Sequence, residues 1–285
     1  MATLRDRRTQ PKRRKRRVRR VRVGAADPRL TPAGGVEAVR ELDRVLGITA
    51  ALNAGIGSVK QRARGLTSGQ VLMAMASAQL AGEDFMVGLD RRRADTAGQV
   101  LGPVPTPAST TWAGNAKRFT TEHLAGLPAA MKKINTGWVN RLPAVRRGAL
   151  LRVVTIDGDS TDVEVYGRSK DGAAHAYTGA LTLRPHIGHW AEAGVPLAAD
   201  LLGGKEDPRS SVVDLLDRAI AALPDRVEHL QCRWDAGYFA ADLANGCIAR
   251  DIRFAIGAKR TRPLIAAASR VPDEAWVPAI GMDDT

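Results

Sequence analysis

The chain has 285 residues, of which 44% are apolar, so it can bury a core of one to three domains and is not a wholly disordered protein. Its formal net charge of +13 favours a polyanionic partner, but the charge is uneven. Basic residues outnumber acidic ones by 12 to 1 in residues 1–22 and by 16 to 9 in residues 23–150, whereas residues 151–285 hold 15 against 20.

Cysteine usage and hydropathy exclude several other classes. Cys232 and Cys247 form neither a CxxC pair nor a metal-spaced set, which argues against a disulfide framework or a zinc site and fits a reducing cytoplasm. No apolar run reaches the roughly 20 residues of a membrane span, and no signal-peptide core follows the basic start. We therefore expect a cytoplasmic protein without a membrane partner.

Residues 1–22 form a basic arm with too few apolar side chains to offset the entropy of ordering it. We predict that the arm is disordered until it meets an anion, as is typical of arms that bind nucleic-acid phosphates. A solvated run without a function, or a mistranslated leader, would have the same composition. The DNA contacts would come from the unbroken run Lys12, Arg13, Arg14, Lys15, Arg16 and Arg17.

Residues 23–150 are predicted to be mainly helical. Apolar residues recur at three- and four-residue steps from Val36 onward and predict a helix that stops at Gly47. A second helix is predicted to take Thr67 or Ser68 as its cap and to run to Gly82.

A proline-rich stretch over residues 102–107 then precedes a third helix, for which Ser109 is the predicted cap. This helix carries Lys117 and Arg118, which are candidate DNA contacts. Short helices of this kind build helix-turn-helix DNA readers, but they also build inert bundles, and no recognition helix can be identified. Residues 23–150 are thus a candidate DNA-binding region.

After Arg152 the apolar pattern changes to that of strands. Three successive strands are predicted, and helices and strands then alternate, which gives the order βββαβαβ. This layout is typical of a ribonuclease-H-like fold, an α/β domain with a mixed sheet, here spanning residues 151–285. The predicted strands cover residues 153–166, 174–183, 195–202, 227–234 and 252–258, and the helices cover residues 211–223, capped by Ser210 or Ser211, and 239–249.

Acidic residues lie within the first predicted strand and directly after the fourth. Asp157 and Asp159 are two residues apart and so project from one face of the first strand, and Asp235 follows the fourth strand directly. In a ribonuclease-H-like sheet these two strands are neighbours, so Asp159 and Asp235 would meet and could share a metal ion. Alternatively, Asp157 or Asp159 could cap a bulge or pair with Arg168, and Asp235 could open a turn.

Four stretches resemble blocks of one known family, in the same order. They are Ile156 to Thr161 followed by Tyr166-Gly167, then Gly172 to Tyr177, then Arg184-Pro185-His186, and then Arg233 to Phe239. In these stretches, which lie within a match over roughly residues 30–282, the chain resembles the IS1380-type DDE transposases of the wider IS4-like group.

The resemblance implies a transposase that hydrolyses phosphodiester bonds at transposon ends and joins them to target DNA. It implies Asp159 as the first acid of the DDE triad, with Asp157 as its alternate, and Asp235 as the second acid. Asp159 and Asp235 would then be metal ligands for Mg²⁺ or Mn²⁺. The implied partners are double-stranded DNA and a second copy of the chain in a homodimeric synaptic complex on the nucleoid.

The third acid of the triad is expected to be missing. Relatives continue past the strand at residues 252–258 into a helix that carries the catalytic glutamate, whereas Glu274, Asp283 and Asp284 lie in a proline-broken tail. We therefore expect a domain that is truncated at its C-terminal end and inactive by itself. The alternative function is that of a non-catalytic, transposon-derived DNA-binding protein or regulator.

His186 and His189 are a weaker candidate for a metal site. Their three-residue spacing would suit a metal on a helix, but Pro185 and Gly188 favour a loop. Core or surface histidines are the expected interpretation.

Overall fold

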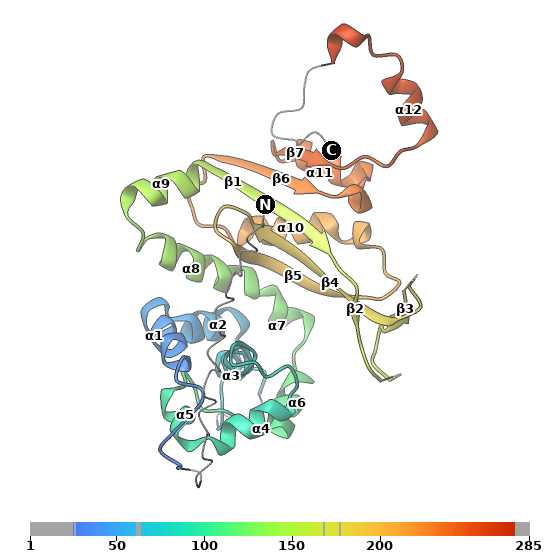
Figure 1. Cartoon of the computed structure of the whole chain (residues 1–285). Coiled ribbons are helices and arrows are strands. Elements are labelled where there is room, and N and C mark those ends of the chain that lie inside the picture. The colour runs from blue at the N-terminus through green and yellow to red at the C-terminus, as the bar shows by residue number, and fades with distance from the viewer. Residues whose placement is uncertain (1–24, 26, 61–63, 168, 177, 277–285) are drawn as a thin grey trace, which may run out of the picture.

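The computed structural model describes residues 25, 27–60, 64–167, 169–176 and 178–276 (Figure 1). Its first half is helical, and its second half is built on one sheet. No helix among the described residues is long and apolar enough to cross a membrane. The helices before the sheet are α1 (Val36–Leu46), α2 (Ile48–Ile56), α3 (Ser68–Leu80), α4 (Val87–Ala94), α5 (Thr96–Leu101), α6 (Ser109–Ala116), α7 (Thr121–Ala125), α8 (Leu127–Val139) and α9 (Ala144–Arg152).

Two of the predicted helix ends are confirmed, and one predicted cap is wrong. Helix α1 ends at Gly47, whose φ of 65° lies in the left-handed region that glycine adopts at little cost. Thr67 caps α3 in a capping box with Gln70. Ser109, in contrast, is the first residue of α6, and its hydroxyl donates to Asp90 instead of capping the helix.

A seven-stranded mixed sheet forms the second half of the described chain. Strand β4 has partners along both edges: β1 and β2 pair antiparallel along one, and β3 and β5 along the other. Strand β6 is parallel to β1, and β7 is parallel to β6, so the predicted neighbourhood of the first and fourth strands is confirmed. The strands are β1 (Val153–Ser160), β2 (Val163–Glu164), β3 (Ala174–His175), β4 (Leu181–Trp190), β5 (Val195–Gly203), β6 (His229–Trp234) and β7 (Arg253–Ile256).

Helices α10 (Val212–Ala221) and α11 (Ala241–Ala249) separate the last strands, and α12 (Arg262–Ala268) extends away from the sheet (Figure 1). Short 3₁₀ helices η1 (Pro208–Ser210), η2 (Ala236–Tyr238) and η3 (Asp273–Ala275) complete the elements. The predicted helix over residues 239–249 thus begins two residues later, as α11. Ser211 precedes α10, but its side chain makes no capping hydrogen bond.

The predicted loop around Pro185 and Gly188 is wrong, because both residues lie inside β4. The carbonyl of Pro185 accepts a hydrogen bond from the N–H of Thr161, which lies in the break between β1 and β2. The nitrogen of Pro185 faces the same break, so the missing N–H leaves no strand acceptor without a donor. Gly188 lies at a β-bulge, and a Cβ there would be 3.2 Å from Ala219 of α10. Glycine therefore allows the helix to pack closely on the sheet.

The first two predicted strands have different limits from those expected. Strand β1 ends at Ser160, and β2 resumes at Val163, so the predicted strand over residues 153–166 is interrupted. Within residues 174–183, only β3 and the first residues of β4 are extended. These limits differ because they depend on hydrogen bonds between strands: β4 pairs with β1 and β5. Local sequence does not reveal such partners.

The main core lies on one face of the sheet. Ile156, Trp190 and Cys232 point toward α8, α10 and α11, where Leu215, Leu216 and Leu243 are fully buried. Alternate residues point to the other face, on which Leu201 is 64% exposed. This open face carries Asp157 and Arg233.

Candidate active site at the ends of β1 and β6

The parallel register of β1 and β6 brings Asp159 and Asp235 to neighbouring positions. The register pairs Asp157 with Arg233 and Gly158 with Trp234. The next residue of β1 is Asp159, and the residue directly after β6 is Asp235. The backbone of Asp235 is still extended, with φ −73° and ψ 178°. Both residues are exposed. Two carboxylates from distant parts of the chain therefore project from adjacent strand ends.

Each of these carboxylates is held by a backbone N–H. The Oδ1 atom of Asp235 accepts from Gly237 at 2.9 Å and so caps η2, and the Oδ1 atom of Asp159 accepts from Ser160 at 2.7 Å. Within the described part of the chain, neither Oδ2 atom has a hydrogen bond or an ion pair. One oxygen of each carboxylate thus fixes the side chain, and the other can take a ligand.

Asp157, the alternate first acid, is already paired. The guanidinium of Arg233 donates two hydrogen bonds of 2.7 Å to its two carboxylate oxygens, and this contact raises the pKa of Arg233. The expected ion pair of Asp157 is thus made with Arg233, whereas Arg168 lies outside the described residues. Asp235 opens the turn of η2, as the alternative interpretation expected.

A buried aromatic group supports the acid pair from below. The ring of Trp234 covers the α-carbon of Gly158, where a Cβ would meet ring carbons at 1.8 to 2.3 Å. Tyr238 packs on Trp234 with a centroid distance of 4.9 Å. Burial raises the pKa of Tyr238 to about 12, and the carboxylates of Asp159 and Asp235 both add to that rise. The phenol therefore stays protonated near neutral pH, and the two carboxylates lie within electrostatic range of the same side chain.

His186 also stacks on Tyr238, with ring centroids 5.5 Å apart. It is fully buried, and neither ring nitrogen has a hydrogen-bond partner among the described residues. Burial lowers its pKa, which the nearby carboxylate of Asp200 partly opposes. His189 pairs with Asp157 and His186 with Ser160, so the two histidines point to opposite faces of β4 and cannot share a metal ion.

Three cations border a cleft of about 760 Å³ beside Asp235. Arg184 is held by Asp162 at 2.9 Å, and Arg209 pairs with Asp207, whose pKa it lowers to about 2. Lys259 makes no ion pair with any described residue. Sequence reasoning gave none of these three a role, because they come from three segments that are distant in the sequence.

Comparison with known proteins identifies the family. The transposase DDE domain group 1 family matches residues 13–283, which is more than half of the chain. The chain belongs to that family. A solved structure, the Mos1 transposase paired-end complex with left transposon end, is 13% identical, with 68% of this chain and 61% of that chain covered and a TM-score of 0.26. The match thus spans less than two thirds of the Mos1 chain. No curated protein matches.

Among the described residues of this transposase-family chain, no other predicted site residue joins the acid pair. No group of three His, Cys, Asp or Glu residues able to hold a metal ion occurs within the described ranges, and Glu274 is exposed in η3. Lys117 and Arg118 are exposed just after α6. Asp283 and Asp284, and the arm residues Lys12, Arg13, Arg14, Lys15, Arg16 and Arg17, lie outside the described residues.

Proposed function

We propose that this chain is a DNA transposase of the IS1380 type, built on a ribonuclease-H-like sheet, in which Asp159 and Asp235 hold a divalent metal ion. The observation that carries the proposal is the adjacency of Asp159 and Asp235 on parallel strands. Its substrates are the ends of a transposon and a target DNA, and it works as a homodimer on the nucleoid.

The acid pair fits a hard divalent cation. Like charges on neighbouring strands repel, so two adjacent carboxylates weaken the sheet unless a cation neutralises them. Carboxylate oxygens are the ligands that Mg²⁺ and Mn²⁺ prefer, and Mg²⁺ is commonly held by one or two carboxylates together with substrate phosphates. The unpaired Oδ2 atoms of Asp159 and Asp235 supply those ligands.

The surrounding residues orient this pair. The N–H groups of Ser160 and Gly237 fix one oxygen of each carboxylate, which reduces the entropy lost when a ligand binds. Asp157 is neutralised by Arg233, so its carboxylate links β1 to β6 and does not bind the metal ion. When bound, the cation would polarise a phosphate oxygen at the scissile bond.

The cations of the cleft suit a nucleic-acid strand. Arg184, Arg209 and Lys259 lie beside Asp235, and guanidinium and ammonium groups bind phosphate oxygens through charge-assisted hydrogen bonds. We assign them to the phosphates that flank the scissile bond. The basic arm adds contacts to the duplex that do not depend on sequence.

A DNA-binding regulator that occupies transposon ends without cutting them is the second candidate. The observation that favours it is the lack of a third metal-ligating side chain beside the acid pair within the described residues. Both candidates bind DNA, but only the transposase needs the metal ion.

The test measures metal binding and cleavage separately. Mn²⁺ binding to the full chain is followed by calorimetry, and nicking of end-containing DNA is followed with Mg²⁺ or Mn²⁺. Asp159→Asn and Asp235→Asn should each weaken Mn²⁺ binding about tenfold or more, because a carboxylate ligand is lost. Asp157→Asn should leave binding nearly unchanged.

Asp242→Asn is the matched control, since Asp242 is exposed on α11 and has no hydrogen bond or ion pair in the described structure. Equal Mn²⁺ affinity in the wild type and both acid-pair variants would refute the metal site. Metal binding that is lost in those variants, without any nicking by the wild type, would favour the regulator.

A further inference from the structure

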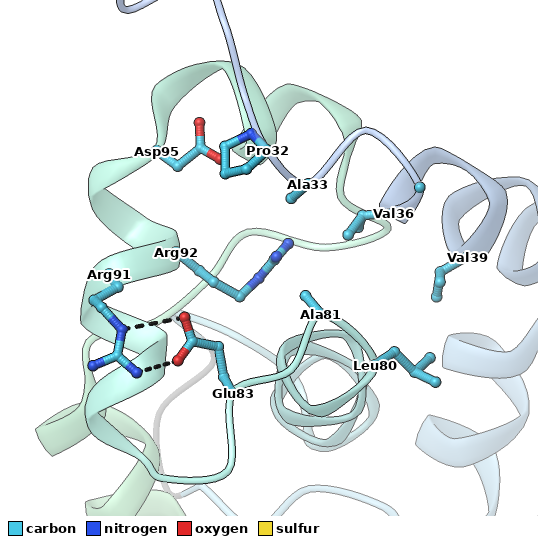
Figure 2. A pocket seen from close by; sticks show the side chains of 11 residues that line it. Pro32, Ala33, Val36, Val39, Leu80, Ala81, Glu83, Arg91, Arg92 and Asp95 are labelled. Carbon is cyan, nitrogen blue, oxygen red and sulfur yellow. Dashed lines mark hydrogen bonds and ion pairs between the residues drawn. The ribbon is translucent and has the colours of Figure 1, made fainter. Parts of the chain in front are cut away.

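A second hollow lies in the helical region, away from the acid pair (Figure 2). It has a volume of about 540 Å³, within the range of small-molecule sites, and lies between the start of α1, the end of α3 and α4. Its walls are largely apolar. Val36 is buried and Val39 half-buried, and Leu80 is 72% exposed at the rim, so the hollow is open to solvent.

One charged side chain points into this hollow from α4. Arg92 is only 9% exposed, and Figure 2 shows its side chain crossing the pocket toward Val36 and Ala81. It forms no hydrogen bond or ion pair with any described residue, and its Nε atom is fully buried without a partner. Arg92 is thus an unpaired, nine-tenths buried cation.

The two acidic side chains that line the pocket already have other hydrogen-bond partners. Glu83 binds Arg91, which also lines the hollow, and not Arg92 (Figure 2). Asp95 accepts from the hydroxyl of Thr31 and from the N–H of Gly98. Because a buried guanidinium is costly without a hydrogen-bonded counter-charge, the site favours an anion that comes from solution.

We propose that this pocket binds a small organic anion, with its acidic group against Arg92 and a short apolar body against Val36, Val39 and Leu80. The planar guanidinium suits a carboxylate or a phosphate group through two parallel hydrogen bonds. The apolar walls exclude a bare inorganic ion as the best-fitting ligand, since they would remain in contact with water. A bound ligand bridges α1, α3 and α4.

The test uses hexanoate, hexyl phosphate and hexanol as probes of the full chain. Calorimetry gives the affinity, and thermal unfolding gives the ligand-dependent rise in Tm. Hexanoate or hexyl phosphate should bind saturably, and hexanol, which has the same body without the charge, should bind at least about tenfold more weakly. The stronger of the two anions identifies the acidic group.

Arg92→Met should weaken binding of the preferred anion about tenfold or more, because the charge-assisted hydrogen bonds are lost. Arg93→Met is the matched control on the same helix, since Arg93 is exposed. Leu80→Glu gives a second variant that keeps the core intact and should also weaken binding, because it places a negative charge at the rim. Equal binding of hexanol and the anions, unchanged affinity in Arg92→Met, or no saturable binding of either anion would overturn the proposal.

Discussion

The packing of Trp234 on Gly158 makes Gly158→Ala the most informative single substitution beneath the acid pair. An added Cβ would lie 1.8 Å from the nearest ring carbon, and Cβ contacts essentially never fall below 3.0 Å, so the ring must move by at least 1.2 Å. Trp234 is 5% exposed and rests on Tyr238, which is 1% exposed, so the ring has no empty space to enter. We expect a loss of about 3 kcal/mol of unfolding free energy, at the upper end of overpacked cores.

Chemical denaturation followed by circular dichroism measures this loss. In a Trp234→Ala background the same substitution should cost less than about 0.5 kcal/mol, because the methyl group then enters the vacated space. Gly148→Ala is the control: Gly148 is exposed in α9 with nothing within 4 Å of an added Cβ, and alanine there should stabilise the helix by about 0.5–1 kcal/mol. A cost for Gly158→Ala that is small, or that is the same with and without the Trp234 ring, would refute the packing argument.

Two further predictions concern protonation and the basic arm. Burial lowers the pKa of His186, faced by Asp200, Asp159 and Arg218, so the unfolded chain takes up a proton below the ordinary pKa of 6.5 that the folded chain does not. The free energy of unfolding should therefore fall as the pH falls from 7 to 5, by at most about 1.4 kcal/mol per pH unit from this group. His186→Phe should flatten that slope in denaturation titrations at several pH values. The control is His229→Gln, at an exposed position, which should leave the slope unchanged. Deleting residues 1–22 should weaken non-specific DNA binding and flatten its salt dependence by about 0.9 in slope for each lost phosphate contact, and an unchanged slope would reject DNA binding by the arm.

Local sequence signals predicted the elements whose limits depend on single residues. Gly47 ends α1 because glycine adopts the left-handed conformation readily, and Thr67 begins α3 because its hydroxyl accepts a free N–H of the first turn. The adjacency of β1 and β6 followed from the order of strands and helices, which is typical of a ribonuclease-H-like sheet, and the structure shows that the two strands are parallel. In each case the cause lies within a few residues or in the connectivity.

Long-range contacts stabilise the elements that the sequence did not predict. Helix α8 contains Asn135, Thr136 and Gly137, which are weak helix formers. Asn135 is nevertheless 2% exposed, because its side-chain amide donates to the carbonyl of Ala222 after α10, 87 residues away. Strand β4 depends in the same way on its neighbours, which supply pairing on both sides of Pro185. Local propensity cannot reveal such contacts.

The choice between Asp157 and Asp159 depends on a partner strand. Both side chains leave the same face of β1, so their spacing cannot distinguish them. The register with β6 places an arginine beside the first and an aspartate beside the second, which gives the two acids opposite electrostatic surroundings. Arg233 satisfies Asp157 with two hydrogen bonds, whereas the like charge of Asp235, at the end of the neighbouring strand, repels that of Asp159. This contrast is the reason why we propose the cation between Asp159 and Asp235, and shifting the register by two residues would move that preference to Asp157.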